Sequence, residues 1–178
     1  MPVPCTREEI DALILASAGD EFMYTLLMVA KTTGRRISEY YDVRVMDIDF
    51  DKGIMKTKVL KRKTKIEKEA ILTSEVSMIL RRYIAKNHFK LEDYVFRKVS
   101  KRQIQNLVIK YAQKANISHK VTFHNMRHYF VTELIKKGWS YDKIAKLTGH
   151  STPTTLVHYD HAVASDIKED ALEALRDI

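Results

Sequence analysis

The sequence is poor in the residues that cross-link small proteins or interrupt regular structure. It contains one cysteine, five glycines and three prolines among 178 residues. Its lone cysteine, Cys5, excludes both an internal disulfide and a Cys-based metal site. No apolar run reaches the roughly 20 residues that a bilayer span needs, and the N-terminus lacks the pattern of a signal peptide. We therefore expect a cytoplasmic protein with no membrane association, no metal and no other cofactor.

Scarce chain breakers and long stretches of helical periodicity predict a mainly α fold. Thr6 and Glu9 have the spacing of a capping box, which marks a helix start. Gly53 begins the one region of strand character, an antiparallel hairpin over residues 54–58 and 66–71. We expect a single domain over residues 1–178, with helices at residues 6–16, 21–32, 37–45, 75–86, 101–114, 123–137, 141–147, 153–159 and 166–176.

Positive charge dominates the chain, with 31 Lys and Arg against 23 Asp and Glu, a net charge of +8. This surplus favours a polyanionic partner such as a nucleic acid. Residues 56–68 of the predicted hairpin concentrate it, since Glu67 is the one acid there among seven basic residues: Lys56, Lys58, Lys61, Arg62, Lys63, Lys65 and Lys68. Such a cluster can neutralise DNA phosphates and release their counterions. A solvated surface of the kind found in heat-adapted proteins is the alternative.

Three separated segments combine arginine, histidine and tyrosine. The first, residues 33–39, holds Arg36 and, one helical turn later, Glu39. In the second, residues 122–132, His124 and Arg127 are three positions apart, so both side chains can reach one phosphate from the same helix face. The third contains Gly149 and His150, followed nine positions later by Tyr159.

Metal binding by the second segment is a competing interpretation, because His124 and His128 are spaced i and i+4. The helix lacks the glutamate that follows the first histidine in a zinc protease motif, and no Cys or acidic ligand lies close by in sequence. We therefore predict no metal at this helix.

In their order, these segments resemble the tyrosine recombinase (phage integrase) family, over about residues 6–162. The resemblance implies a helical catalytic domain with a small three-stranded antiparallel sheet at one edge, and a double-stranded DNA target. Typical members also carry an N-terminal core-binding domain, which we expect to be absent from this chain. The helix at about residues 165–176 is either exchanged between protomers or packed on its own core, so delivery of Tyr159 in cis or in trans stays open.

The resemblance implies catalytic roles for six residues, Arg36, Lys63, His124, Arg127, His150 and Tyr159, with Glu39 in support. Tyr159 would attack the scissile phosphate and form a 3′-phosphotyrosyl link with a free 5′ hydroxyl. A phenol has a pKa of about 10 and is a weak nucleophile at neutral pH, so it needs help from cationic neighbours. Arginine forks would hold the phosphate oxygens in a geometry that lysine does not reproduce.

The position of the catalytic lysine depends on how the hairpin is counted. Counting back from residues 70–72 places it at Lys63, with Lys61 as the reserve from a count forward from Gly53. The resemblance also implies self-association on DNA as a dimer or tetramer, in the integration of virus or plasmid DNA or a related recombination. A type IB topoisomerase and a DNA-binding module without catalysis are the alternatives, the latter with a helix-turn-helix near residues 139–147.

Overall fold

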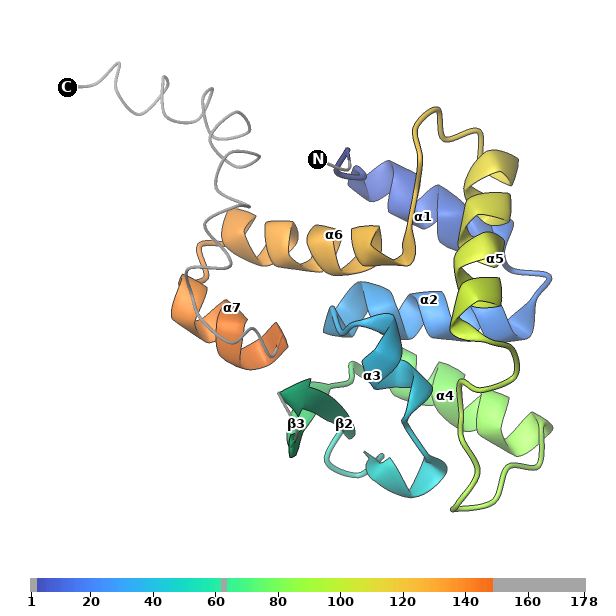
Figure 1. The fold of residues 1–178 in the computed structure, drawn as a ribbon, viewed down its shortest axis with the longest axis vertical. Coiled ribbons are helices and arrows are strands. Elements are labelled where there is room, and N and C mark those ends of the chain that lie inside the picture. The colour runs from blue at the N-terminus through green and yellow to red at the C-terminus, as the bar shows by residue number, and fades with distance from the viewer. Residues whose placement is uncertain (1–2, 62–63, 149–178) are drawn as a thin grey trace.

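The computed structural model describes residues 3–61 and 64–148, and the backbone alone for residues 59–61 and 64–66. The described part is mostly helical, with one three-stranded antiparallel sheet (Figure 1). This confirms the predicted fold class. In chain order the elements are α1 (Arg7–Ala16), α2 (Glu21–Thr33), α3 (Ile37–Tyr41), the 3-10 helix η1 (Val45–Asp47), β1 (Ile48–Asp49), β2 (Ile54–Lys61), β3 (Thr64–Ile71), α4 (Ser74–Lys86), α5 (Lys101–Lys114), α6 (Phe123–Lys136) and α7 (Tyr141–Thr148). The helices predicted at residues 153–159 and 166–176 lie outside the described residues.

Side-chain caps begin the helices at polar residues of the sequence. Thr6 Oγ1 accepts a hydrogen bond from the Glu9 backbone N–H at 3.2 Å, and Glu9 Oε2 accepts one from the Thr6 N–H at 2.9 Å. The predicted capping box of α1 is therefore confirmed. Ser100 and Gln103 form a second box at the start of α5. Each such cap typically stabilises its helix by about 1 kcal/mol.

Helix α2 occupies the centre of the core and packs against α1, α4 and α6. It buries apolar residues on nearly all sides, among them Phe22, Leu26 and Val29. The fully buried ring of Tyr40 on α3 packs edge-on against Phe96. Burial of apolar area on this scale is the main term that stabilises the domain.

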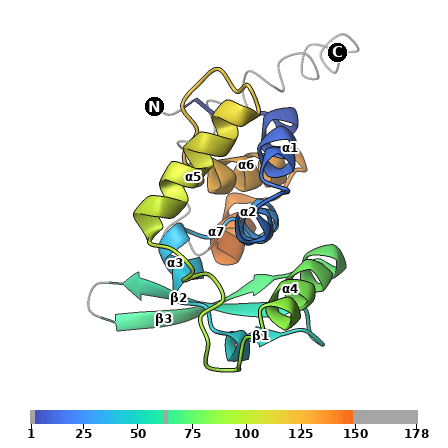
Figure 2. The ribbon, with the colours of Figure 1, turned by 90° about the vertical axis from the view of Figure 1, so that its right-hand side faces the viewer.

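The sheet has the order β1-β2-β3, and its long hairpin pairs Ile54 with Ile71 at one end and Lys61 with Thr64 at the other. It lies at one end of the molecule, beside the helices, with α4 alongside (Figure 2). The expectation of a single strand region after Gly53 was incomplete, because β1 precedes it. A strand of two residues is too short to show an alternating pattern.

Helix α3 is shorter than predicted and ends at Tyr41 instead of Val45. The physical reason is a competing set of hydrogen bonds. Val43 accepts one from the Val95 N–H at 3.0 Å, and the Val45 N–H donates to the Asp93 carbonyl at 3.1 Å. The backbone after Tyr41 therefore pairs with residues 93–95 instead of continuing the helix.

Gly34 ends α2 and directs the chain toward α3. Its φ of 60° is left-handed, a conformation that glycine adopts without a steric penalty. A Cβ at this position would also overlap the ring of Phe130 on α6. The turn between α2 and α3 therefore lies directly against α6. Among the described residues, no helix is long and apolar enough to cross a membrane.

Candidate active site

Helix α6 carries the second motif of the sequence. Its first turn is ordered by Asn125, whose Oδ1 accepts hydrogen bonds from the Thr122 N–H at 2.8 Å and the Thr122 hydroxyl at 2.9 Å. His124 is exposed at this helix start, whereas Arg127, one turn later, is only 1% exposed. The two side chains that the sequence predicts on one face therefore differ in their access to solvent.

Arg127 connects three segments of the chain. Its Nη1 donates hydrogen bonds to the Gly34 carbonyl at 2.9 Å and to the Thr148 carbonyl at 2.8 Å. Gly34 lies two residues before Arg36, and Thr148 lies at the end of α7. Hydrogen bonds from a charged donor to buried carbonyls are stronger than neutral ones. They hold the first and second motifs side by side, although the motifs are about 90 residues apart in sequence.

Arg36 and Glu39 interact at the start of α3. Arg36 Nη1 donates to Glu39 Oε1 at 3.2 Å, and the Arg36 side chain remains 43% exposed while that of Glu39 is 3% exposed. The buried carboxylate thus restrains the arginine from the protein side and leaves part of its guanidinium open to solvent. An exposed guanidinium with one side held by a buried carboxylate is suited to binding an anion.

The ionisation of His124 shows that the motifs also interact electrostatically. Its pKa is lowered first by partial desolvation, and then by the positive charges of Arg127 and Arg36. Both guanidinium groups therefore act on one imidazole at the start of α6. Positive groups from two distant segments converge here, and such convergence of titratable groups is typical of functional sites.

His128 lies one turn further along α6 and is half-buried. Its pKa is lowered by desolvation and by His124. In the part of the chain that the structure describes, the one group of three or more potential metal ligands does not include His124 or His128. Nothing in the described geometry favours the zinc interpretation of this helix.

Lys56, Lys58 and Lys68 are the basic residues of the hairpin whose side chains the structure describes. Lys56 Nζ forms an ion pair with Glu67 Oε1 at 3.1 Å across the two strands, and this partner raises the pKa of Lys56. Both side chains are about half exposed, so the pair contributes little to stability. Lys58 is paired in register with Glu67. Lys61 and Lys65 lie on β2 and β3, while Arg62 and Lys63 lie outside the described residues.

The sequence model of the phage integrase family matches residues 5–165, nearly the whole chain. The chain belongs to the phage integrase family. It is 31% identical over 170 residues to a tyrosine recombinase from Pseudothermotoga lettingae, which covers 94% of the chain and 58% of that relative.

Solved structures of this family share the fold. The crystal structure of XerA recombinase matches with a TM-score of 0.79 and 27% identity, over 96% of this chain and 64% of that one. XerH recombinase, in a post-cleavage complex with its palindromic difH substrate, matches with a TM-score of 0.79 over 96% of this chain and 52% of that one. Its 18% identity establishes likeness of fold alone. The chain thus spans less than two thirds of the length of these relatives.

Arg35 is a residue of this integrase-family site that the sequence interpretation missed. It is fully buried, and its Nη2 donates a hydrogen bond to the Glu69 carbonyl on β3. Its Nη1 lies 3.9 Å from Glu39 Oε2, so one carboxylate is shared by two successive arginines. The i,i+4 spacing of Arg35 and Glu39 was a usable signal. Arg35 therefore links the first motif of the family to the basic hairpin.

Within the described residues, the structure brings together Arg36, Glu39, His124 and Arg127. His150, Tyr159 and Lys63 lie outside them, so their positions remain predictions. Thr148, whose carbonyl accepts a hydrogen bond from Arg127, precedes His150 by two residues.

Proposed function

We propose that this chain is the catalytic domain of a site-specific DNA recombinase that cleaves and rejoins DNA through Tyr159. The observation that carries the proposal is the convergence of Arg36, Arg127 and His124 from two segments about 90 residues apart. Arg127 donates to the Gly34 carbonyl beside Arg36, and both arginines depress the pKa of His124. A cationic site of this composition suits a phosphodiester.

The two arginines would have different parts in binding the scissile phosphate. Arg36 is partly exposed and restrained by Glu39, so it can meet an incoming phosphate without a large rearrangement. Arg127 is fixed by its carbonyl partners, so its charge is preorganised. Preorganised donors that meet charge as it develops in the transition state typically contribute about 3 to 4 kcal/mol each.

The reaction would proceed by exchange of one phosphodiester for another. The Tyr159 oxygen forms a bond to phosphorus, the phenolic proton passes to a neighbouring base such as His124, and the bond to the 5′ oxygen breaks. Lys63, or Lys61 in its place, would protonate the departing 5′ oxygen, and His150 would donate to a non-bridging oxygen. Attack by a second 5′ hydroxyl then reverses these steps and releases Tyr159. Neither metal nor ATP is required by this balance.

The proposed partner is double-stranded DNA, with the basic hairpin as a contacting element. Its contacts with DNA would be Lys56, Lys58, Lys61, Arg62 and Lys65. XerH, which shares the fold, is bound to its difH substrate in the matched structure. We also propose that copies of the chain associate on DNA as dimers or tetramers, since strand exchange needs two duplexes, and that they act on cytoplasmic DNA.

Covalent trapping tests the proposal directly. Nicked duplexes with a randomised half-site and a labelled strand are incubated with the protein in EDTA without ATP, and denaturing gels reveal protein linked to the 3′ phosphate. Sequencing the linked DNA then identifies the target. We expect an adduct with wild type and with the control Tyr24→Phe, and none with Tyr159→Phe.

Two outcomes would overturn the proposal. One is an adduct that persists in Tyr159→Phe, and the other is DNA binding in mobility-shift assays without any adduct, which would leave a DNA-binding module. Supercoil relaxation without exchange between two sites would instead favour a topoisomerase. The recombinase names of the relatives speak against that alternative.

A further inference from the structure

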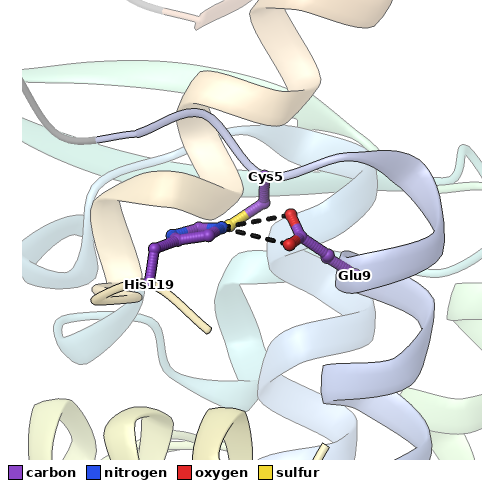
Figure 3. A group of neighbouring side chains, drawn as sticks. All are labelled: Cys5, Glu9 and His119. Atoms are coloured by element: carbon purple, nitrogen blue, oxygen red, sulfur yellow. Dashed lines mark hydrogen bonds and ion pairs between the residues drawn. The ribbon is translucent and has the colours of Figure 1, made fainter. Parts of the chain in front are cut away.

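Three side chains of metal-ligand type meet at a site apart from the arginine cluster. Cys5 precedes α1, Glu9 lies in its first turn, and His119 lies in the connection between α5 and α6. The sulfur, carboxylate and imidazole point toward one another (Figure 3). His119 Nε2 lies 3.2 Å from each Glu9 oxygen, and the three ligand atoms all lie within 4.8 Å of one another.

The spacing is close to that of a tetrahedral metal site. Zinc bonds of about 2.3 Å to sulfur and about 2.0 to 2.2 Å to nitrogen and oxygen set ligand atoms roughly 3.4 to 3.7 Å apart. The pair His119–Glu9 is already near this value, and no pair in the cluster needs to approach by more than about 1.1 to 1.4 Å. Glu9 Oε2 accepts the capping hydrogen bond from Thr6, so Oε1 is the oxygen that a metal would take.

The ligand types select among cations. Thiolate and imidazole favour zinc and similar transition metals, whereas magnesium and calcium prefer sites made of oxygen alone. Cys5 is 7% exposed, while the His119 and Glu9 side chains are 18% and 26% exposed. Solvent can therefore supply a fourth ligand on the side of the histidine and the carboxylate.

We propose that Cys5, Glu9 and His119 bind one zinc ion, with water as the fourth ligand. Binding releases the thiol proton of Cys5 to solvent, so two anionic ligands balance the charge of the dication.

The site would join the N-terminal segment to the helix that carries His124 and Arg127. Asn125 on α6 donates from its Nδ2 to the Val3 carbonyl at 2.8 Å, and its side chain also interacts with Cys5. The ion would therefore fasten residues 3–9 to the entrance of α6. Its role is structural and separate from the chemistry at Tyr159.

The sequence alone did not predict a metal site at Cys5. A lone cysteine cannot form a site built of cysteines, but one thiol can still combine with ligands from other segments. His119 is 114 positions from Cys5, and no local motif joins them.

Metal titration of tag-free protein tests the proposal. Cobalt replaces zinc as a probe, because a thiolate ligand produces a charge-transfer absorption in the near ultraviolet. We expect a 1:1 complex with this absorption, displaced by zinc. Cys5→Ser abolishes the absorption, while His119→Gln and Glu9→Gln weaken binding at least tenfold. Glu9→Gln retains the capping box, so its helix start stays intact.

The matched control is His88→Gln, which removes an exposed histidine outside the cluster. It should bind cobalt like the wild type. Zinc at about 100 times its Kd should raise the Tm of wild type and control by about 5 to 10 °C, and leave that of Cys5→Ser unchanged. Absence of the absorption in folded wild type, or equal binding by Cys5→Ser, refutes the site. Covalent trapping in EDTA is independent of either result.

Discussion

Arg127→Lys should destabilise the domain, whereas Arg36→Lys should leave its stability nearly unchanged, although both should slow catalysis. Arg127 is buried, and its Nη1 donates to two buried carbonyls, those of Gly34 and Thr148. Lysine keeps the charge, but its shorter, flexible side chain does not hold a donor where the rigid guanidinium places Nη1, so it retains at most part of this bridge. Hydrogen bonds of charged groups contribute about 1.5 to 3 kcal/mol each, so we expect Arg127→Lys to lose about 2 to 3 kcal/mol.

Arg36→Lys provides the contrast. The Arg36 side chain is 43% exposed and pairs with Glu39, so the free energy of unfolding should change by less than about 1 kcal/mol. Urea unfolding and thermal melts measure the difference. For a domain of this size, Arg127→Lys should lower the Tm by about 4 to 12 °C. Both variants should form the covalent adduct far more slowly.

The refuting result is specific. If Arg127→Lys unfolds at the same urea concentration as the wild type, its bonds to the Gly34 and Thr148 carbonyls do not hold the motifs together. If Arg36→Lys destabilises the domain as much as Arg127→Lys, the exposed arginine has a structural role that its contacts do not explain. Equal loss of adduct in two equally stable variants would contradict the stabilising role assigned to Arg127 alone.

Three further predictions concern neighbouring residues. Arg35→Leu removes a hydrogen bond to the Glu69 carbonyl and a buried positive charge, and should destabilise the domain by about 2 to 3 kcal/mol in urea; a neutral result would show that this link is dispensable. Gly34→Ala meets a left-handed φ and the Phe130 ring, so we expect a loss of at least about 2 kcal/mol, and an unchanged melt contradicts the close packing. The pKa of His124 is depressed, so the unfolded chain binds more protons and stability rises with pH just below about 6.5. His124→Asn should flatten that rise, and an identical pH profile would show that the pKa of His124 is not lowered in the folded protein.

The buried ion cluster at the first motif is in direct contact with the hairpin. Arg35 and Arg36 share the Glu39 carboxylate, and Arg35 also contacts β3. A displacement of the hairpin would therefore move Arg35 and Glu39, and with them the guanidinium of Arg36. We therefore expect a change in the hairpin to alter the position of Arg36 as well.

Much of the architecture was predictable from local patterns. Capping residues such as Thr6 mark helix starts because backbone N–H groups there need partners within three residues. The spacing of His124 and Arg127 likewise predicts a shared helix. The end of α3 was not predictable, because Val43 and Val45 bond to residues 93–95, about 50 positions away. The residues around the end of α3 give no signal for such a distant partner.

The sequence by itself determined the helical class, the basic hairpin and the family, since these depend on periodicity, charge and motif order. The tertiary structure decided which groups meet. Burial of Arg127 against the Gly34 carbonyl, the hydrogen bond from Arg35 to the Glu69 carbonyl on β3, and the meeting of Cys5 with His119 all join distant segments. Packing of the whole core sets these contacts, and for that reason no local pattern encodes them.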